Sequence, residues 1–497
     1  MRGADAIAGL ADAPARLAAL AGLDLAGVTA DSRRVGPGDL FVALPGTRAD
    51  GRAFIAEAVA RGACAVLAPP GTVWPEGVPA RPLIADAAAR RDLALLAARF
   101  AGAQPATIAA VTGTNGKTST VAFLRQIWAG AGRRAASLGT LGLEVAGASA
   151  SAAPASAASG AALTTPDPVA LAGTLAALAR AGVTHAAMEA SSHGLDQCRL
   201  DGVRLAAGAF TNLTRDHLDY HGSLEAYRAA KLRLFDTLLP AGAPAIADAA
   251  LDPPTLAALH EIAARRRLDL RTVGEAGTAL RLIGAHPRAD GQDLIVARPD
   301  GRRRDLALAL PGRFQADNAL LAAVIAEALG EGDALASLPA LAPVRGRLEL
   351  AARVNGAAAY VDYAHTPDAL SRALAALRPH TAGKLVVVFG AGGDRDRGKR
   401  PLMGAEAARG ADLVIVTDDN PRSEDPAAIR AEILPGCPGA REIGDRAAAI
   451  AAGLNALRPG DVLVVAGKGH EQGQIIGATT IPFDDAAVIR RLAGTDA

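Results

Sequence analysis

Short apolar runs, each ending at a polar or glycine-containing segment, alternate with alanine-rich helical patterns in the first part of the chain. Residues 28–32 and 39–44 are predicted strands, and residues 53–61 are a predicted helix. This alternation of strands and helices is typical of α/β units. We therefore predict a small α/β domain over residues 1–97.

The same alternation continues over residues 98–342, which we predict to be a central domain. The pattern predicts strands at residues 107–111, 184–189 and 208–212 and helices at residues 119–130 and 223–237. Residues 146–162 contain only Ala, Ser, Gly and Pro, which supply no large side chains to a core, so we interpret this tract as a mobile insertion.

A third α/β domain is predicted over residues 343–497. Its apolar runs at residues 385–389, 413–416 and 462–466 have the pattern of buried parallel strands, and each is followed by a polar or glycine-rich loop. Ligands of such sheets bind at the carboxyl ends of the strands. The loops after these runs are therefore the first candidates for a binding site.

Composition limits the possible partners. Of the 497 residues, 50% are hydrophobic, 21% are charged and 3% are aromatic, so we expect globular domains with cores of Ala, Val and Leu. A net charge of +1 argues against a nucleic-acid or membrane-surface binder. The three cysteines form no C-x-x-C pair, and no signal peptide or apolar run of membrane-spanning length is present. We expect a soluble, cytoplasmic protein.

A glycine-rich loop connects the strand at residues 107–111 to the helix that follows. It reads Gly113-Thr114-Asn115-Gly116-Lys117-Thr118. Glycines let the backbone surround a phosphate chain, and a helix N-terminus supplies free N–H donors. Lys117 would balance phosphate charge and the Thr118 hydroxyl would bind Mg²⁺. Val111 departs from the general P-loop pattern, which has glycine there, and a tight turn with an incidental lysine is the alternative.

Polar residues also follow the next two predicted strands. Glu189 leads into Ser-Ser-His-Gly, and residues 212–219 read Asn-Leu-Thr-Arg-Asp-His-Leu-Asp. Magnesium prefers oxygen ligands and keeps several waters, so one carboxylate with phosphate oxygens makes a normal site. His217 is a less usual magnesium ligand, and a single histidine is more often structural. However, five of the nine histidines lie in such segments, which favours a site.

An acidic loop with one arginine follows the strand at residues 413–416. Residues 418–425 read Asp-Asp-Asn-Pro-Arg-Ser-Glu-Asp, a sequence that also suits a solvated turn. Two other polar loops, at residues 392–398 and 467–471, follow neighbouring strands. An arginine can bind a carboxylate through two hydrogen bonds, and acidic side chains can bind an ammonium. These loops therefore favour a site for a substrate that carries both groups.

Taken together, these motifs resemble the Mur ligase family, and most closely its diaminopimelate-adding members. The resemblance rests on Gly-Thr-Asn-Gly-Lys-Thr, Glu-x-Ser-Ser-His, Asn-x-x-x-Asp-His-x-Asp and Asp-Asn-Pro-Arg, in the order of the family, and extends from Asp31 to Glu471. It implies a three-domain α/β architecture with a central P-loop-type ATPase domain and a Rossmann-like C-terminal domain. A glutamine, Gln315, stands where relatives often have asparagine, which puts the adenine contacts in doubt.

The activity that the resemblance implies is ATP-dependent amide ligation in peptidoglycan precursor synthesis. Meso-2,6-diaminopimelate would be added to UDP-N-acetylmuramoyl-L-alanyl-D-glutamate through an acyl phosphate, with ATP as substrate, Mg²⁺ as cofactor and the protein as a monomer. Two alternatives remain open. A folylpolyglutamate synthetase-like ligase has the same core chemistry but needs neither the N-terminal domain nor Asp-Asn-Pro-Arg. A non-enzymatic nucleotide-dependent binding module would not need Glu189, His217 and Lys231 together.

The resemblance also implies roles for individual residues. The predicted catalytic residues are Lys117, Glu189, His217 and Lys231, and the predicted metal ligands are Thr118, Glu189, His217 and Lys231, with Lys231 carbamylated. The predicted ATP-binding residues are Gly113, Thr114, Asn115, Gly116, Lys117, Thr118, Asn318, Arg347 and Asp362. The predicted UDP-substrate residues are Ala30, Ser32, Thr47, Arg48, Ala49, Thr164, Thr165, Ser191, Gln197 and Arg199. The predicted diaminopimelate-binding residues are Arg395, Asp419, Asn420, Pro421, Arg422, Gly467 and Glu471.

Overall fold

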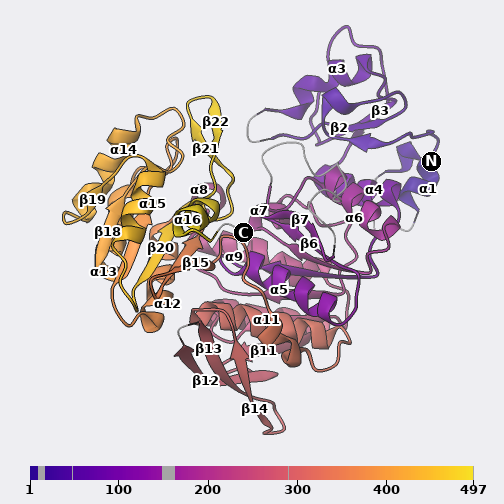
Figure 1. Cartoon of the computed structure of the whole chain (residues 1–497). Helices are drawn as coiled ribbons and strands as arrows, with labels where there is room; N and C mark the ends of the chain where they lie inside the picture. The colour runs from indigo at the N-terminus through magenta and orange to yellow at the C-terminus, as the bar shows by residue number, and fades with distance from the viewer. Residues whose placement is uncertain (9–16, 47–48, 148–162, 289, 496–497) are drawn as a thin grey trace. The chain divides into compact units, whose positions relative to one another are not determined.

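The computed structural model describes residues 1–8, 17–46, 49–147, 163–288 and 290–495. The chain divides into two compact units, each built from helices packed on largely parallel sheets (Figure 1). The first unit is Met1–Thr272 with Val324–Gly332, and the second is Val273–Ala323 with Asp333–Ala497. The predicted boundaries after residues 97 and 342 stay predictions, and most of the tract at residues 146–162 lies outside the described residues.

The helices and strands of the first unit begin and end as follows. They are α1 (Gly3–Ile7), η1 (Ala18–Leu20), β1 (Val28–Thr29), η2 (Ser32–Arg34), β2 (Leu40–Val42), η3 (Gly51–Phe54), α3 (Ile55–Ala60), β3 (Ala65–Ala68), β4 (Leu83–Ala85), α4 (Ala89–Ala101), β5 (Thr107–Thr112), α5 (Lys117–Gly130), β6 (Ala135–Gly139), β7 (Gly142–Val145), α6 (Pro168–Arg180), β8 (His185–Glu189), α7 (Ser192–Asp196), β9 (Ala207–Phe210), α8 (Leu218–His221), α9 (Leu224–Arg233), η6 (Leu234–Leu238), β10 (Pro244–Asp248), α10 (Pro253–Arg266) and β11 (Asp269–Gly274), which reaches the unit boundary.

The N-terminal sheet of the first unit is parallel in the order β1-β2-β3-β4. Successive residues of β2 face opposite sides, so that Leu40 and Val42 enter one apolar core and Phe41 enters another. Both sides of the sheet are therefore covered. The strand predicted at residues 28–32 is shorter than expected. The Asp31 carboxylate accepts a hydrogen bond from Arg33 N, which starts the turn η2 instead of extending β1.

In the first unit, the strands of the larger sheet have the order β11-β10-β9-β5-β8-β6-β7. Strands β10, β9, β5, β8 and β6 are parallel, and β7 is antiparallel to β6. The strand β5, which precedes the phosphate loop, lies between β8 and β9. Because these strands are parallel, Glu189 at the end of β8 and the segment after β9 lie at the same edge as the loop. The predicted strands and helices of this region are confirmed to within a few residues.

The second unit contains the remaining elements. They are β12 (Leu280–Arg288), β13 (Gly291–Ala297), β14 (Arg303–Leu308), α11 (Arg313–Ala328), whose last turn belongs to the first unit, η7 (Ala334–Ala340), β15 (Glu349–Val354), β16 (Ala357–Asp362), α12 (Pro367–Leu377), η8 (Arg378–His380), β17 (Leu385–Phe389), α13 (Lys399–Gly410), β18 (Leu413–Val416), α14 (Pro426–Ile433), η9 (Leu434–Gly436), β19 (Arg441–Glu442), α15 (Arg446–Asn455), β20 (Val462–Ala466), β21 (Gly473–Ile476), β22 (Thr479–Pro482) and α16 (Asp485–Ala493).

The main sheet of the second unit has the order β15-β16-β20-β17-β18-β19 and is parallel except for β15. The three predicted parallel strands, now β17, β18 and β20, are confirmed with the expected bounds. Apolar residues from both sides of this sheet form separate cores. An antiparallel hairpin, β21-β22, follows β20. The loops after β17, β18 and β20 lie at one edge of the sheet.

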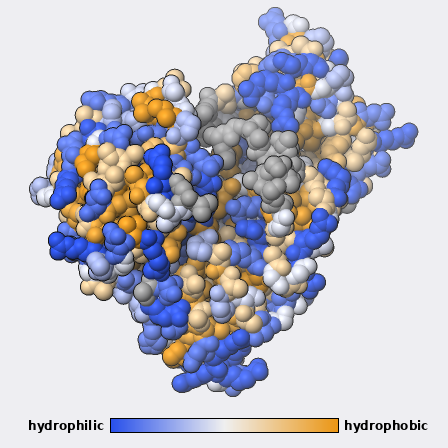
Figure 2. Space-filling view, in the orientation of Figure 1, coloured by the Kyte–Doolittle hydropathy of each residue, from blue (hydrophilic) through white to orange (hydrophobic). Residues whose placement is uncertain are grey.

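Polar and apolar residues are interspersed over the face of the molecule in view (Figure 2). The most exposed large apolar side chains of the described residues include Val73, Leu402 and Leu163, which are far apart in the sequence. Among the described helices, none combines the length and the apolar character needed to cross a lipid bilayer.

Candidate active site

The phosphate loop between β5 and α5 has the backbone that its glycines predict. Gly113 has φ +144°, and a Cβ there would lie 1.9 Å from Thr211 Oγ1, so the position admits only glycine. Gly116 has φ +86° and precedes the first residue of α5, Lys117. The Lys117 ammonium donates to the carbonyl oxygens of Gly113 and Thr114, each at 2.8 Å. The loop therefore curves around its own lysine at a helix N-terminus, where an anion is favoured.

The segment after β9 stabilises this loop. Thr211 Oγ1 donates to Asn115 O at 2.5 Å, and Asn212 Oδ1 accepts from Asn115 N at 2.9 Å. Thr114 N donates to Asn212 O at 2.8 Å, and Thr114 Oγ1 lies 3.2 Å from the buried Tyr227 hydroxyl. Asn212 and Thr214, from the segment 212–219 for which the sequence suggested a metal site, thus contact the phosphate loop, and the metal role of the segment stays a prediction.

Glu189 is a buried carboxylate beside the phosphate loop. Its side chain is 1% exposed, and its two oxygens accept hydrogen bonds from the main chain and the hydroxyl of Thr140, at 2.8 and 3.2 Å. Within the described residues it forms no ion pair with a lysine or arginine. A buried anion that meets only neutral donors is unfavourable unless a cation binds it. This environment fits a magnesium ligand, and Thr118, at the start of α5, offers a hydroxyl oxygen of the kind that magnesium also binds.

Lys231 is a buried lysine on α9. It is 1% exposed, its ammonium donates to Gly113 O at 2.7 Å, and it lies 4.4 Å from the centre of the Tyr227 ring. Burial, and then the charge of Lys117, lower its pKa well below the ordinary value of 10.5. Its nitrogen is therefore more available as a neutral amine than that of a surface lysine.

His217 lies just before α8 in a left-handed backbone conformation, with φ +52°. Its side chain is half exposed, 3.5 Å from the Asp216 carboxylate, and its ring centre lies 4.9 Å from that of His193. Burial, followed by the nearby His217 and His221, lowers the pKa of His193 to about 4. In the described part of the chain, no three His, Cys, Asp or Glu side chains converge as a complete metal cage.

The residues predicted to bind the peptide part of the UDP substrate form one hydrogen-bonded group. Thr165 Oγ1 donates to Glu189 O at 3.0 Å and accepts from Ser191 N at 3.0 Å. Arg199 donates to Thr165 O at 2.6 Å and to Gln197 Oε1 at 2.7 Å. Thr164 Oγ1 lies 3.3 Å from Thr140 Oγ1, beside the same carboxylate. Folding thus brings these predicted residues directly to Glu189.

Gln197 and Arg199 also line a pocket of about 640 Å³ in the first unit. The predicted residues Ala30, Ser32 and Ala49 line it as well, while Thr47 and Arg48 lie outside the described residues. The charged residues on its wall that sequence reasoning missed include Arg34, Glu57, Arg90 and Asp167. No local motif marked them, because they come from separate segments. The pocket has the size expected for a nucleotide-sized ligand.

In the second unit, the turn that carries Arg347 is hydrogen-bonded to the buried Asp362. Asp362, at the end of β16, accepts hydrogen bonds from Leu348 N at 2.8 Å and Ala364 N at 2.9 Å. Burial raises the pKa of Asp362, and the nearby Arg347 opposes this shift. The Arg347 guanidinium lies 4.8 Å from the Tyr363 ring centre. Both predicted nucleotide residues therefore lie at the carboxyl end of the sheet of this unit.

Asn318, the other predicted nucleotide residue of this unit, is buried on α11. One turn earlier, Gln315 donates through Nε2 to Arg347 O at 2.9 Å. Its Oε1 is buried and has no hydrogen-bond partner among the described residues. The departure from asparagine at position 315 therefore links α11 to the turn that carries Arg347.

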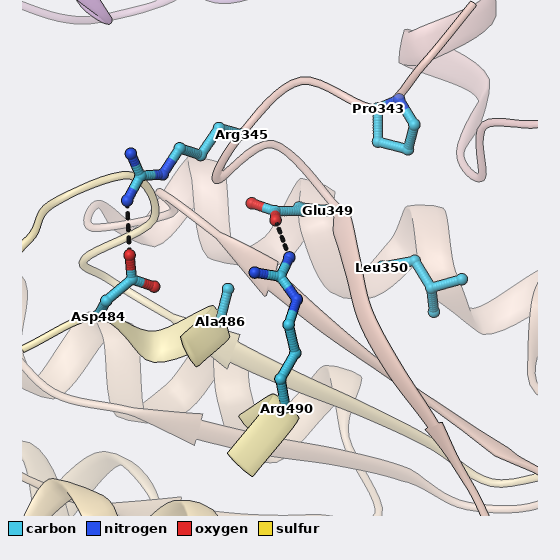
Figure 3. A pocket seen from close by; sticks show the side chains of 7 residues that line it. All are labelled: Pro343, Arg345, Glu349, Leu350, Asp484, Ala486 and Arg490. Carbon is cyan, nitrogen blue, oxygen red and sulfur yellow. Dashed lines mark hydrogen bonds and ion pairs between the residues drawn. The ribbon is translucent and has the colours of Figure 1, made fainter. Parts of the chain in front are cut away.

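Two ion pairs stabilise the turn around Arg347. Arg345 pairs with Asp484 at 2.5 Å, and Arg490 of α16 pairs with Glu349 at 2.7 Å (Figure 3). They line a hollow of about 370 Å³. Figure 3 shows each charge directed at its partner, so the hollow has the features of a structural contact between α16 and this turn.

The predicted diaminopimelate residues meet at the ends of β17, β18 and β20. Asn420 Nδ2 donates to Glu471 Oε2 at 2.8 Å, and a Cβ on Gly467 would lie 2.5 Å from Asp419 Oδ2. Arg422 has φ +54° and donates through Nη1 to Gly393 O at 2.8 Å. Arg395 is exposed on the loop after β17. Pro421 is buried between Asn420 and Arg422.

Two buried cations of this region had no predicted role. Arg400 is fully buried and binds both Glu424 oxygens, at 2.8 and 2.9 Å, and Glu432 at 2.8 Å. Lys468 is fully buried between Gly467 and Gly469. The glycines on both sides of Lys468 were the one sequence signal that could have identified it.

Comparison with known proteins agrees with this geometry. Residues 24–101 match the model described as Mur ligase family, catalytic domain, residues 111–326 match the Mur ligase middle domain, and residues 346–469 match the Mur ligase, glutamate ligase domain. The three-domain α/β prediction is confirmed.

Individual relatives match over nearly their whole length. The UDP-N-acetylmuramoyl-L-alanyl-D-glutamate–2,6-diaminopimelate ligase of Caulobacter vibrioides is 57% identical, over 95% of this chain and 96% of the relative. The ligase of the same name from Rhizobium meliloti is 52% identical over 95% of each chain. A solved structure of a ligase of this name has a TM-score of 0.69 and 33% identity, and covers 96% of each chain. The chain belongs to the Mur ligase family.

Proposed function

We propose that this protein is an ATP-dependent amide ligase that adds meso-2,6-diaminopimelate to UDP-N-acetylmuramoyl-L-alanyl-D-glutamate during peptidoglycan precursor synthesis. The observation that carries this proposal is the 57% identity to a ligase of that name over 95% of the chain. The same observation favours it over a folylpolyglutamate synthetase-like ligase. The buried Glu189 beside the phosphate loop supports an enzyme over a simple nucleotide-binding module.

ATP binds at the phosphate loop in this proposal. The loop N–H groups and Lys117 hold the phosphates at the start of α5. Asn318, Arg347 and Asp362, which belong to the second unit, are the other residues that the family resemblance implies for the nucleotide. Thr118, Glu189 and His217 would hold Mg²⁺, which would supply positive charge beside the transferring phosphoryl group. The environment of Glu189 supports this, because its buried carboxylate otherwise meets only neutral donors.

Arg199, Gln197, Ser191 and Thr165 orient the substrate so that its D-glutamyl carboxylate faces the γ-phosphate. An oxygen of that carboxylate attacks phosphorus, the bond to ADP breaks, and an acyl phosphate forms. The amine of diaminopimelate then attacks the acyl carbon, phosphate leaves, and the amine proton is released to form an amide. Much of the rate enhancement comes from holding the reacting groups within reach of each other, because this makes each step effectively unimolecular.

Lys231 is carbamylated in the active enzyme. Its neutral amine bonds to the carbon of CO₂ and loses a proton, which converts a cation into an oxygen-donor anion. The lowered pKa of Lys231 supports this reaction, because the neutral amine is the reactive form. An anion at this position would also suit the neighbouring cation site better than an ammonium.

The UDP part of the substrate occupies the 640 Å³ pocket, with Ala30, Ser32 and Ala49 as contacts. Thr47 and Arg48, outside the described residues, keep the substrate-binding role that the family resemblance implies. Diaminopimelate binds at Arg395, Asp419 to Arg422, Gly467 and Glu471. We divide the chain into a UDP-substrate domain, residues 1–97, an ATP-binding domain, residues 98–342, and an amino-acid domain, residues 343–497. The enzyme works in the cytoplasm as a monomer, without nucleic-acid or membrane partners.

Product mass tests the proposal directly. The full chain is incubated with ATP, Mg²⁺, the UDP-linked dipeptide and an equimolar mixture of meso-diaminopimelate, L-lysine and L-ornithine. We expect a single product heavier by diaminopimelate minus water, formed with one ADP and one phosphate. A parallel reaction with dihydrofolate and L-glutamate tests the folylpolyglutamate alternative. Product in that reaction alone, or ATP hydrolysis without any amide, would refute the proposed function.

A further inference from the structure

Lys468 is a fully buried lysine just after β20, and its ammonium joins its own loop to the loop after β18. Its Nζ donates to Asn420 Oδ1 at 3.0 Å, to Glu471 Oε2 at 3.1 Å and to Gly473 O at 2.5 Å. An ammonium has three N–H donors, and each has an acceptor here. A buried charge is costly unless it is fully paired, so these contacts determine where the ammonium lies.

The ammonium also determines which way the Asn420 amide points. Asn420 Oδ1 accepts from Lys468 at 3.0 Å and from Ile475 N at 3.0 Å, so this atom must be the oxygen. The opposite atom, Nδ2, then donates to Glu471 Oε2 at 2.8 Å. Without Lys468, one of the two donors that fix this orientation would be lost, and the amide could rotate.

Lys468 and Asn420 together hold the carboxylate of Glu471. Its Oε2 accepts from both Lys468 and Asn420, whereas within the described residues Oε1 accepts no hydrogen bond. The Glu471 side chain remains 32% exposed although its partner Lys468 is fully buried. Oε2 is thus held by Lys468 and Asn420, and Oε1 of this partly exposed side chain has no hydrogen bond among the described residues.

From this geometry we propose that Lys468 is a positioning residue of the amino-acid site, which holds Asn420 and Glu471 so that the free carboxylate oxygen binds an ammonium group of diaminopimelate. This inference rests on the proposed function. Lys468 touches no substrate in this account. It acts through Asn420, which lies 48 positions away in the sequence, and through Glu471, which lies 3 positions away.

A purely structural role for the buried charge makes a different prediction. If Lys468 only stabilised the fold, its loss would lower stability without a selective effect on diaminopimelate. Asp461 offers a matched control, because it is a buried charged residue directly before β20, whereas Lys468 follows β20. Its carboxylate accepts from Lys384 N at 2.6 Å and Arg458 N at 2.8 Å, at the opposite end of the strand from the site.

The experiment measures KM for diaminopimelate, ATP and the UDP-linked dipeptide in full-length wild type, Lys468→Met, Lys468→Arg and Asp461→Asn, together with the melting temperature of each. We expect Lys468→Met to raise KM for diaminopimelate by about 10- to 100-fold, the range for losing an oriented charged hydrogen bond. KM for ATP and for the dipeptide should change less than about twofold. Lys468→Arg keeps the charge, but its planar guanidinium cannot direct three donors from one nitrogen to the three acceptors, so its effect should be intermediate.

Asp461→Asn should lower the melting temperature and leave KM for diaminopimelate unchanged. If Lys468→Met fails to fold, Lys468→Arg decides the question. Unchanged KM for diaminopimelate in a folded Lys468 variant, or an equal rise in all three KM values, would overturn the inference and leave the ligase proposal intact. A wild type that forms no diaminopimelate product would overturn both.

Discussion

Replacing Arg422 with alanine should remove most of the preference for diaminopimelate over L-lysine. The two amino acids share the reacting amine and the carbon chain, and only diaminopimelate carries a distal carboxylate. Arg422 Nη1 donates to Gly393 O at 2.8 Å, which holds one side of the guanidinium. Within the described residues Nε and Nη2 form no hydrogen bond, so this edge can bind a carboxylate through two bonds.

The size of the effect follows from these two bonds. A hydrogen bond to a charged group contributes about 1.5–3 kcal/mol, so the pair contributes roughly 3–6 kcal/mol. At about 1.4 kcal/mol per tenfold change, kcat/KM for diaminopimelate should fall by about 10²- to 10⁴-fold. The slow reaction with lysine should barely change. The fold should survive, because the Arg422 main chain keeps its hydrogen bonds to Ile475 O and Gly477 N, at 3.0 and 2.7 Å.

A competition assay with both amino acids, read by product mass, measures the preference in wild type and variants. Arg397→Ala is the matched control, because Arg397 lies on the neighbouring loop, is 65% exposed and pairs with Glu432. It should leave the preference unchanged. Arg395 can share the carboxylate, so the double variant with Arg422→Ala should lose any preference that remains. Equal losses for both amino acids in Arg422→Ala would refute the carboxylate contact, and a wild type that accepts lysine as readily would refute the assignment of this loop.

Three further predictions concern separate parts of the molecule. Lys231→Ala should lower kcat by about 10²-fold or more, with partial recovery on addition of short carboxylic acids, and full activity without them would contradict carbamylation. Arg199→Ala should raise KM for the UDP-linked dipeptide by about tenfold or more and change KM for ATP by less than about twofold. If both KM values stay unchanged, Arg199 does not contact the substrate. Hydrogen bonds from Arg400 hold the pKa of Glu424 at about 2, below its usual 4.5. The ionised Glu424 therefore stabilises the folded protein fully above about pH 4.5, and this stabilisation is lost as the pH falls toward 2. Urea unfolding of wild type and Glu424→Gln should therefore differ most at pH 6, and the difference should shrink steadily as the pH falls from 4.5 toward 2. A difference that stays constant over this range would contradict this origin.

Local patterns in the sequence were sufficient to predict several of the strands, the phosphate loop and the polar loops after those strands. The runs that became β17, β18 and β20 are apolar on both faces, which is the pattern of strands covered on both sides of a parallel sheet. The phosphate loop could be found because glycine, lysine and a helix start occur within six residues. In each case the physical cause acts over a few neighbouring positions, so it can be read along the chain.

The tertiary structure decided which charged side chains meet. Lys468 and Asn420 are 48 residues apart, Lys231 and Gly113 are 118 apart, and nothing in either local sequence indicates the partner. It also decided that Asn212 holds the phosphate loop through Asn115. Burial makes these contacts matter, because a charge removed from water must find partners wherever the fold supplies them. Periodicity predicts which residues are buried, but the folded chain alone determines which of them face each other.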